Sequence, residues 1–160
     1  MRVIAVDPGY DRIGVAVLEG SASSVNLVFS TCIETDKQQD IYERIFDIGK
    51  QVNHIIDKYQ PDAFAIEELY FSRNVSTALK VSEAKGVIVF QALDQGIPVV
   101  EYTPNQVKVA TTGYGRATKT EVHKMVLMLT GLDASKKVRD DEVDAIAVGI
   151  THLASYKHPN

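Results

Sequence analysis

The feature that most constrains the fold is an apolar run near the start of the chain that ends in a carboxylate and a turn. Residues 3–6, Val-Ile-Ala-Val, have the composition of a buried strand, and Asp7-Pro8-Gly9 follows them. A second apolar run at 13–18 predicts a hairpin at the centre of a sheet, with Asp7 at its mouth. Because a charge at the end of a buried strand is costly unless a cation or donor meets it, Asp7 is a candidate site residue. The alternative is that Asp7 only caps the turn through its own backbone.

The next two segments extend this sheet and cover one of its faces. Residues 25–33 are rich in β-forming side chains and predict a third strand, which makes an antiparallel meander. Between Asp40 and Tyr59, apolar residues recur at spacings of three and four, which is typical of an amphipathic helix. We expect its apolar stripe to lie on the sheet.

A later apolar segment also delivers carboxylates at its end. Residues 63–66 predict a short buried strand that runs into Glu67-Glu68. A strand, a helix and a strand in this order imply a parallel crossover, which brings the ends of both strands to the same edge of the sheet. We therefore expect Asp7 and one of the two glutamates to be neighbours, although about sixty residues separate them.

The second half of the chain predicts mostly helices. Residues 76–95 form a second helix, in which Ala84 and Gly86 offer small faces to another backbone, and residues 99–102 form the last strand. Two short helical patterns follow within 104–132, and Thr118 or Thr120 could cap the second of them. The loop at 113–120 lacks the glycine before lysine that a P-loop requires, so we reject nucleotide binding there.

A final helix begins near Asp140 and carries several acids. Asp141 and Asp144 are three residues apart and project from one flank, but Asp140 and Asp144 also share a side. The spacing does not decide between these pairs. Acids in a first helical turn also favour the helix dipole, which explains Asp140 and Glu142 without a site.

Charge is distributed unevenly along the chain. Residues 1–71 carry 6 Lys/Arg against 12 Asp/Glu, residues 72–139 carry 10 against 5, and residues 140–160 carry 1 against 4, within a net charge of -4. A basic middle flanked by acidic ends is typical of a protein that binds a polyanion with one region and concentrates carboxylates with the others. Ordinary surface scatter could produce part of this pattern.

The carboxylates favour a metal site. Two strands end in acids, a terminal helix offers more, and no His or Cys cluster competes as a ligand set. Closely packed carboxylates repel by several kcal/mol unless cations intervene, and Mg²⁺ and Mn²⁺ are hard cations that prefer oxygen. Four carboxylates balance two divalent ions, which at about 3.5–4 Å apart would fit in-line phosphodiester hydrolysis.

Length and composition indicate one domain, residues 1–160, in a cytoplasmic setting. No apolar stretch is long enough to span a membrane, no signal peptide is evident, and the lone Cys32 excludes an internal disulfide. We expect a soluble protein with no membrane contact.

The chain resembles the RuvC family of Holliday junction resolvases, which are ribonuclease H-like nucleases. The matching stretches are residues 7–9 with Gly14, 61–68, 76–80, 106–108, the region of Lys119, 141–147 and 150–152. The resemblance implies an α/β fold with a five-stranded mixed sheet, made of the antiparallel meander plus two parallel strands and flanked by helices. It also implies a homodimer that cuts a four-way DNA junction symmetrically. The partners that it implies are the RuvA and RuvB branch-migration proteins.

The resemblance also assigns roles to individual residues. It implies that two Mg²⁺ ions, or Mn²⁺ in their place, are held by Asp7, Glu67, Asp141 and Asp144. Tyr70 would stack on an unpaired base near the junction core, and Lys108 and Lys119 would meet the scissile region. The candidate DNA contacts are Tyr70, Arg73, Lys80, Lys108, Arg116 and Lys119. Glu68 is expected to lie at the surface or behind the ligands.

Three other functions compete with junction cleavage. The same metal chemistry would serve a related nuclease that acts on another branched DNA or on an RNA-DNA hybrid. A non-catalytic junction-binding module is a further alternative, although the full acidic set argues against it. An actin-like ATPase or kinase domain is disfavoured, because such proteins need a second similar domain that this chain has no room for.

Overall fold

The computed structural model describes residues 1–69, 75–133 and 138–155. Its strands form one five-stranded sheet in the order β3-β2-β1-β4-β5, in which β1 pairs antiparallel with β2 and parallel with β4. The strands are β1 (Arg2–Asp7), β2 (Arg12–Ser21), β3 (Ser24–Glu34), β4 (Ala63–Glu67) and β5 (Val99–Tyr102). The predicted meander and the parallel crossover are both confirmed.

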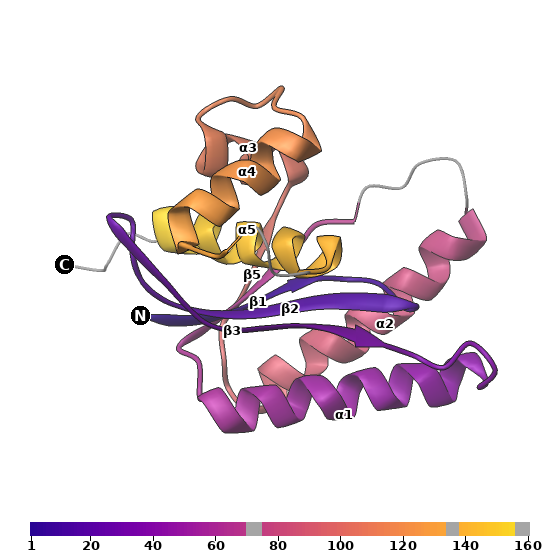
Figure 1. Ribbon diagram of the computed structural model, residues 1–160. Coiled ribbons are helices and arrows are strands. Elements are labelled where there is room, and N and C mark those ends of the chain that lie inside the picture. Colours follow the sequence, from indigo (N-terminus) through magenta and orange to yellow (C-terminus); the bar gives the residue numbers. More distant parts are fainter. Residues whose placement is uncertain (70–74, 134–137, 156–160) are drawn as a thin grey trace.

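Helices cover the two faces of the sheet unequally. They are α1 (Ile41–Tyr59), α2 (Val75–Asp94), α3 (Pro104–Thr112), α4 (Lys119–Thr130) and α5 (Asp140–Ser155). The pair α1 and α2 lies on one face, while α5 lies on the other with α3 and α4 stacked beyond it (Figure 1). None of the helices in these described ranges is long and apolar enough to cross a membrane.

Side-chain size differs between the two faces. Successive residues of a strand point to opposite faces, so Val3 and Ala5 face α5 while Ile4 and Val6 face α1 and α2. The α1 side is filled by large residues, among them Phe64. The α5 side is built mainly from small residues, which include Ala5, Gly14, Ala16, Ala63 and Ala65. The small side chains let α5 approach the sheet closely.

Two glycines mark the points of closest approach between α5 and the sheet. A Cβ atom placed on Gly14 of β2 would lie 1.8 Å from the main-chain oxygen of Asp141 at the start of α5. A Cβ atom on Gly149, farther along α5, would lie 2.3 Å from the Leu18 side chain. Only glycine fits at position 14, because the atoms that a Cβ would meet first are the main-chain oxygen and carbon of Asp141, which cannot move aside as a side chain can. This contact fixes the N-terminal end of α5 against the hairpin that carries Asp7.

Local sequence signals set the boundaries of α1 and α4. Asp40 caps α1, and Thr118 rather than Thr120 caps α4 in a capping box with Glu121.

The prediction that both Ala84 and Gly86 offer small faces to another backbone is corrected by the structure. The two residues do not share a face of α2, because Ala84 is buried against the sheet whereas Gly86 is exposed. Residues two positions apart on a helix are separated by about 200° around its axis, so only Gly86 offers a small outward face.

Candidate active site

Asp7 and Glu67 lie at the same edge of the sheet and on the same face. Val6 of β1 is paired with Ile66 of β4 in the parallel register, so the two acids follow at equivalent ends of neighbouring strands. Asp7 continues the series of Val3 and Ala5, and Glu67 continues that of Ala63 and Ala65, all of which face α5. Glu68 is one residue farther along, so it does not belong to the series that faces α5, and it is exposed.

The start of α5 brings further acids to this edge. Asp141 and Asp144 are mostly covered, with side-chain exposures of 19% and 27%, whereas the Asp140 side chain is 75% exposed. Asp141 also carries the main-chain oxygen that contacts Gly14. The pair that turns inward is therefore Asp141 with Asp144, which decides between the two pairs that spacing allowed.

The other three acids are close enough to Asp7 to perturb it electrostatically. The pKa of Asp7 is raised to about 8, mainly by burial and then by the charges of Glu67, Asp144 and Asp141. Burial and the charge of Asp144 also raise the pKa of Glu67, whereas Lys119 and Lys85 lower it. Asp7 is thus the centre of a cluster of negative charge that is unfavourable without a cation.

Asp144 has two partners on α4. Lys119 donates from Nζ to Oδ2 of Asp144 at 2.7 Å, and Nε2 of His123 lies 2.8 Å from Oδ1. Lys119 and His123 are four residues apart, so both side chains leave α4 on the same side. Each oxygen of the Asp144 carboxylate therefore has its own partner.

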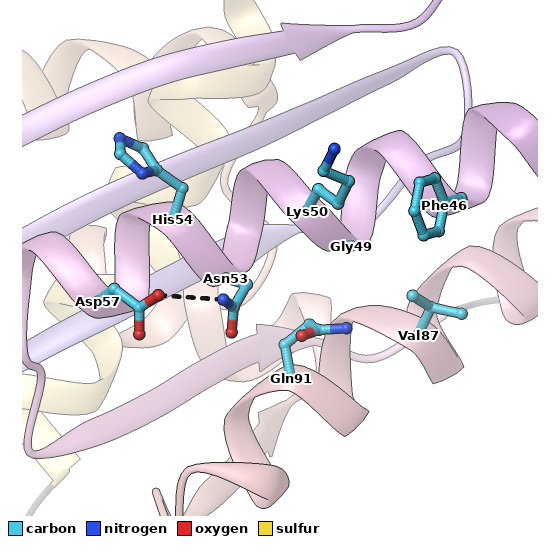
Figure 2. A pocket seen from close by; sticks show the side chains of 8 residues that line it. All are labelled: Phe46, Gly49, Lys50, Asn53, His54, Asp57, Val87 and Gln91. Carbon is cyan, nitrogen blue, oxygen red and sulfur yellow. Dashed lines mark hydrogen bonds between the residues drawn. The ribbon is translucent and has the colours of Figure 1, made fainter.

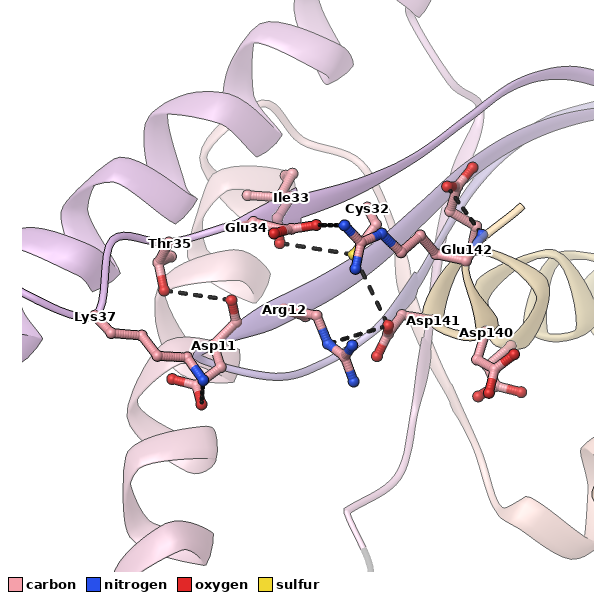
Figure 3. A network of polar contacts seen from close by, with 12 residues as sticks. Asp11, Arg12, Cys32, Ile33, Glu34, Thr35, Lys37, Asp140, Asp141 and Glu142 are labelled. Atoms are coloured by element: carbon pink, nitrogen blue, oxygen red, sulfur yellow. Dashed lines mark hydrogen bonds and ion pairs between the residues drawn. The ribbon is translucent and has the colours of Figure 1, made fainter. Parts of the chain in front are cut away.

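Asp141 has partners on the hairpin and on β3. Its Oδ2 lies 3.4 Å from Nε of Arg12 and accepts from the Cys32 thiol at 3.8 Å. Burial, then the charges of Asp141 and Glu34, raise the pKa of Cys32 to about 11, so the thiol keeps its proton and donates. Figure 3 shows Arg12 and Cys32 directed at Asp141, with Asp140 outside these contacts.

The donor set fits a hard divalent cation. Carboxylate oxygens are the preferred ligands of Mg²⁺ and Mn²⁺, and the clustered charge that raises the pKa of Asp7 would be neutralised by such ions. In the described ranges, no three His, Cys, Asp or Glu side chains are arranged as a metal site as they stand. Asp141 and Asp144 are instead engaged by Arg12, Lys119 and His123. Of these partners, the cations Arg12 and Lys119 partly compensate the charge of the acids.

A pocket of about 230 Å³ opens beside the acids. It combines carboxylates and lysines with an apolar floor, and its lining residues are Glu67, Pro104, Val107, Lys108, Lys119, Val122, Asp144 and Ala147. Two of the predicted DNA contacts, Lys108 and Lys119, therefore share one pocket with two of the predicted ligands.

Lys80 and Arg116, two of the other predicted DNA contacts, do not line this pocket. Nζ of Lys80, on α2, lies 5.5 Å from the ring centroid of Tyr10, which belongs to the turn after Asp7. Arg116 is exposed between α3 and α4. Tyr70 and Arg73 lie outside the described residues.

Four residues at the site were missed by the sequence reasoning, and Cys32, which donates to Asp141, is one of them. Arg12 and His123 contact Asp141 and Asp144, and Lys85 donates to the main-chain oxygen of Glu67 at 3.2 Å and pairs with Glu101 at 3.1 Å. Only His123 carried a usable signal, because it lies one helical turn after Lys119.

The raised pKa of Asp7 predicts a pH-dependent stability. In the unfolded chain the carboxyl loses its proton near pH 3.8, but in the folded protein it does so near pH 8. Between these values the folded state binds more protons, so the free energy of unfolding falls as pH rises, by at most about 1.4 kcal/mol per pH unit. Urea denaturation in chelator should therefore show Asp7→Asn gaining stability over the parent from pH 4 to pH 8. If the difference in unfolding free energy between Asp7→Asn and the parent stays constant over this range, the raised pKa of Asp7 is contradicted.

The sequence matches one protein family along most of its length. Residues 3–152 match the family described as "Crossover junction endodeoxyribonuclease RuvC". Relatives of that name from Petrotoga mobilis and Thermosipho melanesiensis are 41% and 43% identical to the chain. The first match covers 95% of this chain and 93% of the relative, and the second covers 92% and 94%.

Solved structures agree with the sequence matches. The structure entitled "T. thermophilus RuvC in complex with Holliday junction substrate" superposes with a TM-score of 0.89 at 34% identity, covering 95% of this chain and 92% of that chain. The yeast mitochondrial Holliday junction resolvase Ydc2 superposes with a TM-score of 0.70 at 11% identity, which shows a shared fold.

Proposed function

The chain belongs to the RuvC family of crossover junction endodeoxyribonucleases, and from this premise we propose that it resolves four-way DNA junctions by symmetric paired nicks. It would thereby act in DNA recombination and repair. The observation that carries the proposal is the convergence of three acids around Asp7, where burial and their charges raise its pKa, beside a pocket with two lysines. Acids and lysines together suit a reaction at a phosphodiester.

The acids would hold two Mg²⁺ ions, for which Mn²⁺ would substitute. The ligands would be Asp7, Glu67, Asp141 and Asp144. When bound, such ions supply an activated water and stabilise the leaving oxygen of the phosphodiester. The chain's own part is to hold the four carboxylates at one edge of the sheet, with Gly14 fixing the start of α5 against that edge.

The basic residues would hold the DNA. Lys108 and Lys119 line the pocket beside Glu67 and Asp144, where their charges would meet the phosphates flanking the cut. Lys119 also pairs with Asp144, so it would exchange this partner for phosphate when DNA and cations are present. Lys80 and Arg116 would extend the contact along the junction arms, and Tyr70 and Arg73, which lie outside the described residues, are proposed as further contacts.

Symmetric cutting requires two active sites, and α2 offers a surface for a homodimer. Leu79, Phe90 and Leu93 are about 60% exposed, and with Gly86 they form one stripe at helical spacing. A groove of about 310 Å³ runs beside this stripe between α1 and α2, with Phe46 and Val87 at one end (Figure 2). Exposed large apolar side chains in one patch are typical of a protein interface. Membership of the RuvC family also supports the proposal that the branch-migration proteins RuvA and RuvB are partners of this chain.

The decisive test is cleavage of a labelled four-way junction in Mg²⁺, in Mn²⁺ and in chelator. We expect symmetric nicks that require metal, with no cutting of a linear duplex of the same sequence. Cutting of the duplex or of an RNA-DNA hybrid at the same rate would favour a less selective nuclease. Tight junction binding with no cleavage across varied junction sequences would instead favour a binding module.

A further inference from the structure

His123 is a partly buried partner of Asp144 that neither charge patterning nor the proposed reaction accounts for. Its side chain is 18% exposed, and its Nε2 lies 2.8 Å from Oδ1 of Asp144. Its other ring nitrogen, Nδ1, lies 3.9 Å from Asp140, which is beyond hydrogen-bond distance. Among the described residues, the one short polar contact of this imidazole is therefore with the inward-facing acid of α5.

The backbone holds His123 firmly in this position. The capping box of Thr118 with Glu121 fixes the first turn of α4, and Val122 and Val126 are buried in the core shared with α5. A donor on a rigid helix loses little conformational freedom when it orients a ligand. The packing of α4 thus presets where the imidazole meets Asp144.

Lys119 and His123 differ in what they permit at Asp144. Lys119 lies on Oδ2, carries a permanent charge and is 59% exposed. A divalent ion on Asp144 would repel this ammonium. An imidazole can donate from Nε2 while it is neutral, so its bond to Oδ1 is compatible with a cation on Oδ2. Of the two partners, only His123 can stay in place when metal binds.

We infer that His123 is a positioning residue that orients the Asp144 carboxylate for metal binding by donating a hydrogen bond from Nε2 to Oδ1. This inference rests on the proposed metal-dependent function. Hydrogen-bond partners of metal ligands are typically worth about 10- to 100-fold in metal affinity or activity. The same range is expected here.

Four variants test the role of the Nε2 donor. His123→Ala removes the donor, and His123→Gln places an amide where Nε2 was. His123→Asn places its amide nearer the position of Nδ1, so it keeps the polarity but not the reach. Met128→Ala is the matched control, because Met128 is 67% exposed on the same helix as His123. Circular dichroism and thermal melting establish that each variant is folded.

The main readout is Mn²⁺ affinity without DNA, from electron paramagnetic resonance of the free ion. The half-saturating Mg²⁺ concentration for junction cleavage is the second. We expect His123→Ala and His123→Asn to weaken both by about tenfold or more, and His123→Gln to remain within about threefold of the parent. Met128→Ala should match the parent.

Two results would overturn the inference. One is unchanged metal affinity in His123→Ala, and the other is an equal loss in His123→Gln and His123→Asn, which would indicate a structural role only. If His123→Ala does not fold, the Gln and Asn variants decide alone. A parent protein that neither binds Mn²⁺ nor cleaves junctions would instead overturn the proposed function.

Discussion

Asp7→Asn is expected to lower the rate of junction cleavage by about 10³-fold or more while junction binding persists. Asparagine keeps the volume of the side chain but removes the charge at the centre of the acidic cluster. The loss of a metal ligand removes several kcal/mol of transition-state stabilisation, and about 4 kcal/mol corresponds to 10³-fold. Single-turnover cleavage at saturating enzyme measures the rate, and gel mobility shift measures binding.

Neighbouring acids provide matched controls for this experiment. Asp141→Asn should lose cleavage as Asp7→Asn does, whereas Asp140→Asn should stay within a few-fold of the parent, because Asp140 is 75% exposed and Asp141 only 19%. Glu67→Gln and Glu68→Gln should differ in the same way. Cleavage at the parent's rate by Asp7→Asn would show that the acidic cluster is not the catalytic centre.

Much of the fold could be predicted because its signals are local. Each strand is a short apolar run, α1 shows a helical apolar period, and β4 follows α1 as a parallel crossover requires. Strand alternation then places Asp7 and Glu67 on one face at one edge. The strand pattern alone predicted that Asp7 neighbours one of the two glutamates, and the resemblance to the RuvC family selected Glu67.

The choice among the acids of α5 could not be made from spacing. Offsets of three and four residues both share a helix face, so Asp140 and Asp141 were equivalent partners for Asp144. What separates them is the contact of Gly14 with the main chain of Asp141, which sets the rotation of α5 on the sheet. That contact joins residues more than a hundred positions apart and leaves no local pattern.

The partners of the acids were out of reach for a related reason. Cys32, Arg12 and His123 come from three different elements, and their roles depend on how β3, the hairpin and α4 each meet α5. A lone cysteine or histidine in a sequence has many ordinary roles. Only the packed arrangement shows that each of these residues contacts a candidate ligand.

Gly14→Ala is expected to impair both stability and cleavage. The added Cβ would lie 1.8 Å from the main-chain oxygen of Asp141 and 2.5 Å from its carbonyl carbon, so α5 must shift rather than a side chain. Overpacking of this kind costs about 1–3 kcal/mol, and a displacement of about 1 Å at a reacting group can cost about 10²-fold in rate. Urea denaturation and single-turnover cleavage measure the two effects.

A second glycine separates this contact from the general cost of adding a methyl group. In Gly115→Ala the new Cβ would meet chiefly the end of the exposed Asn105 side chain, which can move aside, so stability should change by less than about 0.5 kcal/mol. If Gly14→Ala is as stable and as active as the parent, the start of α5 is not held by this contact. The positions of Asp141 and Asp144 would then have to be set by contacts of α5 other than the one at Gly14.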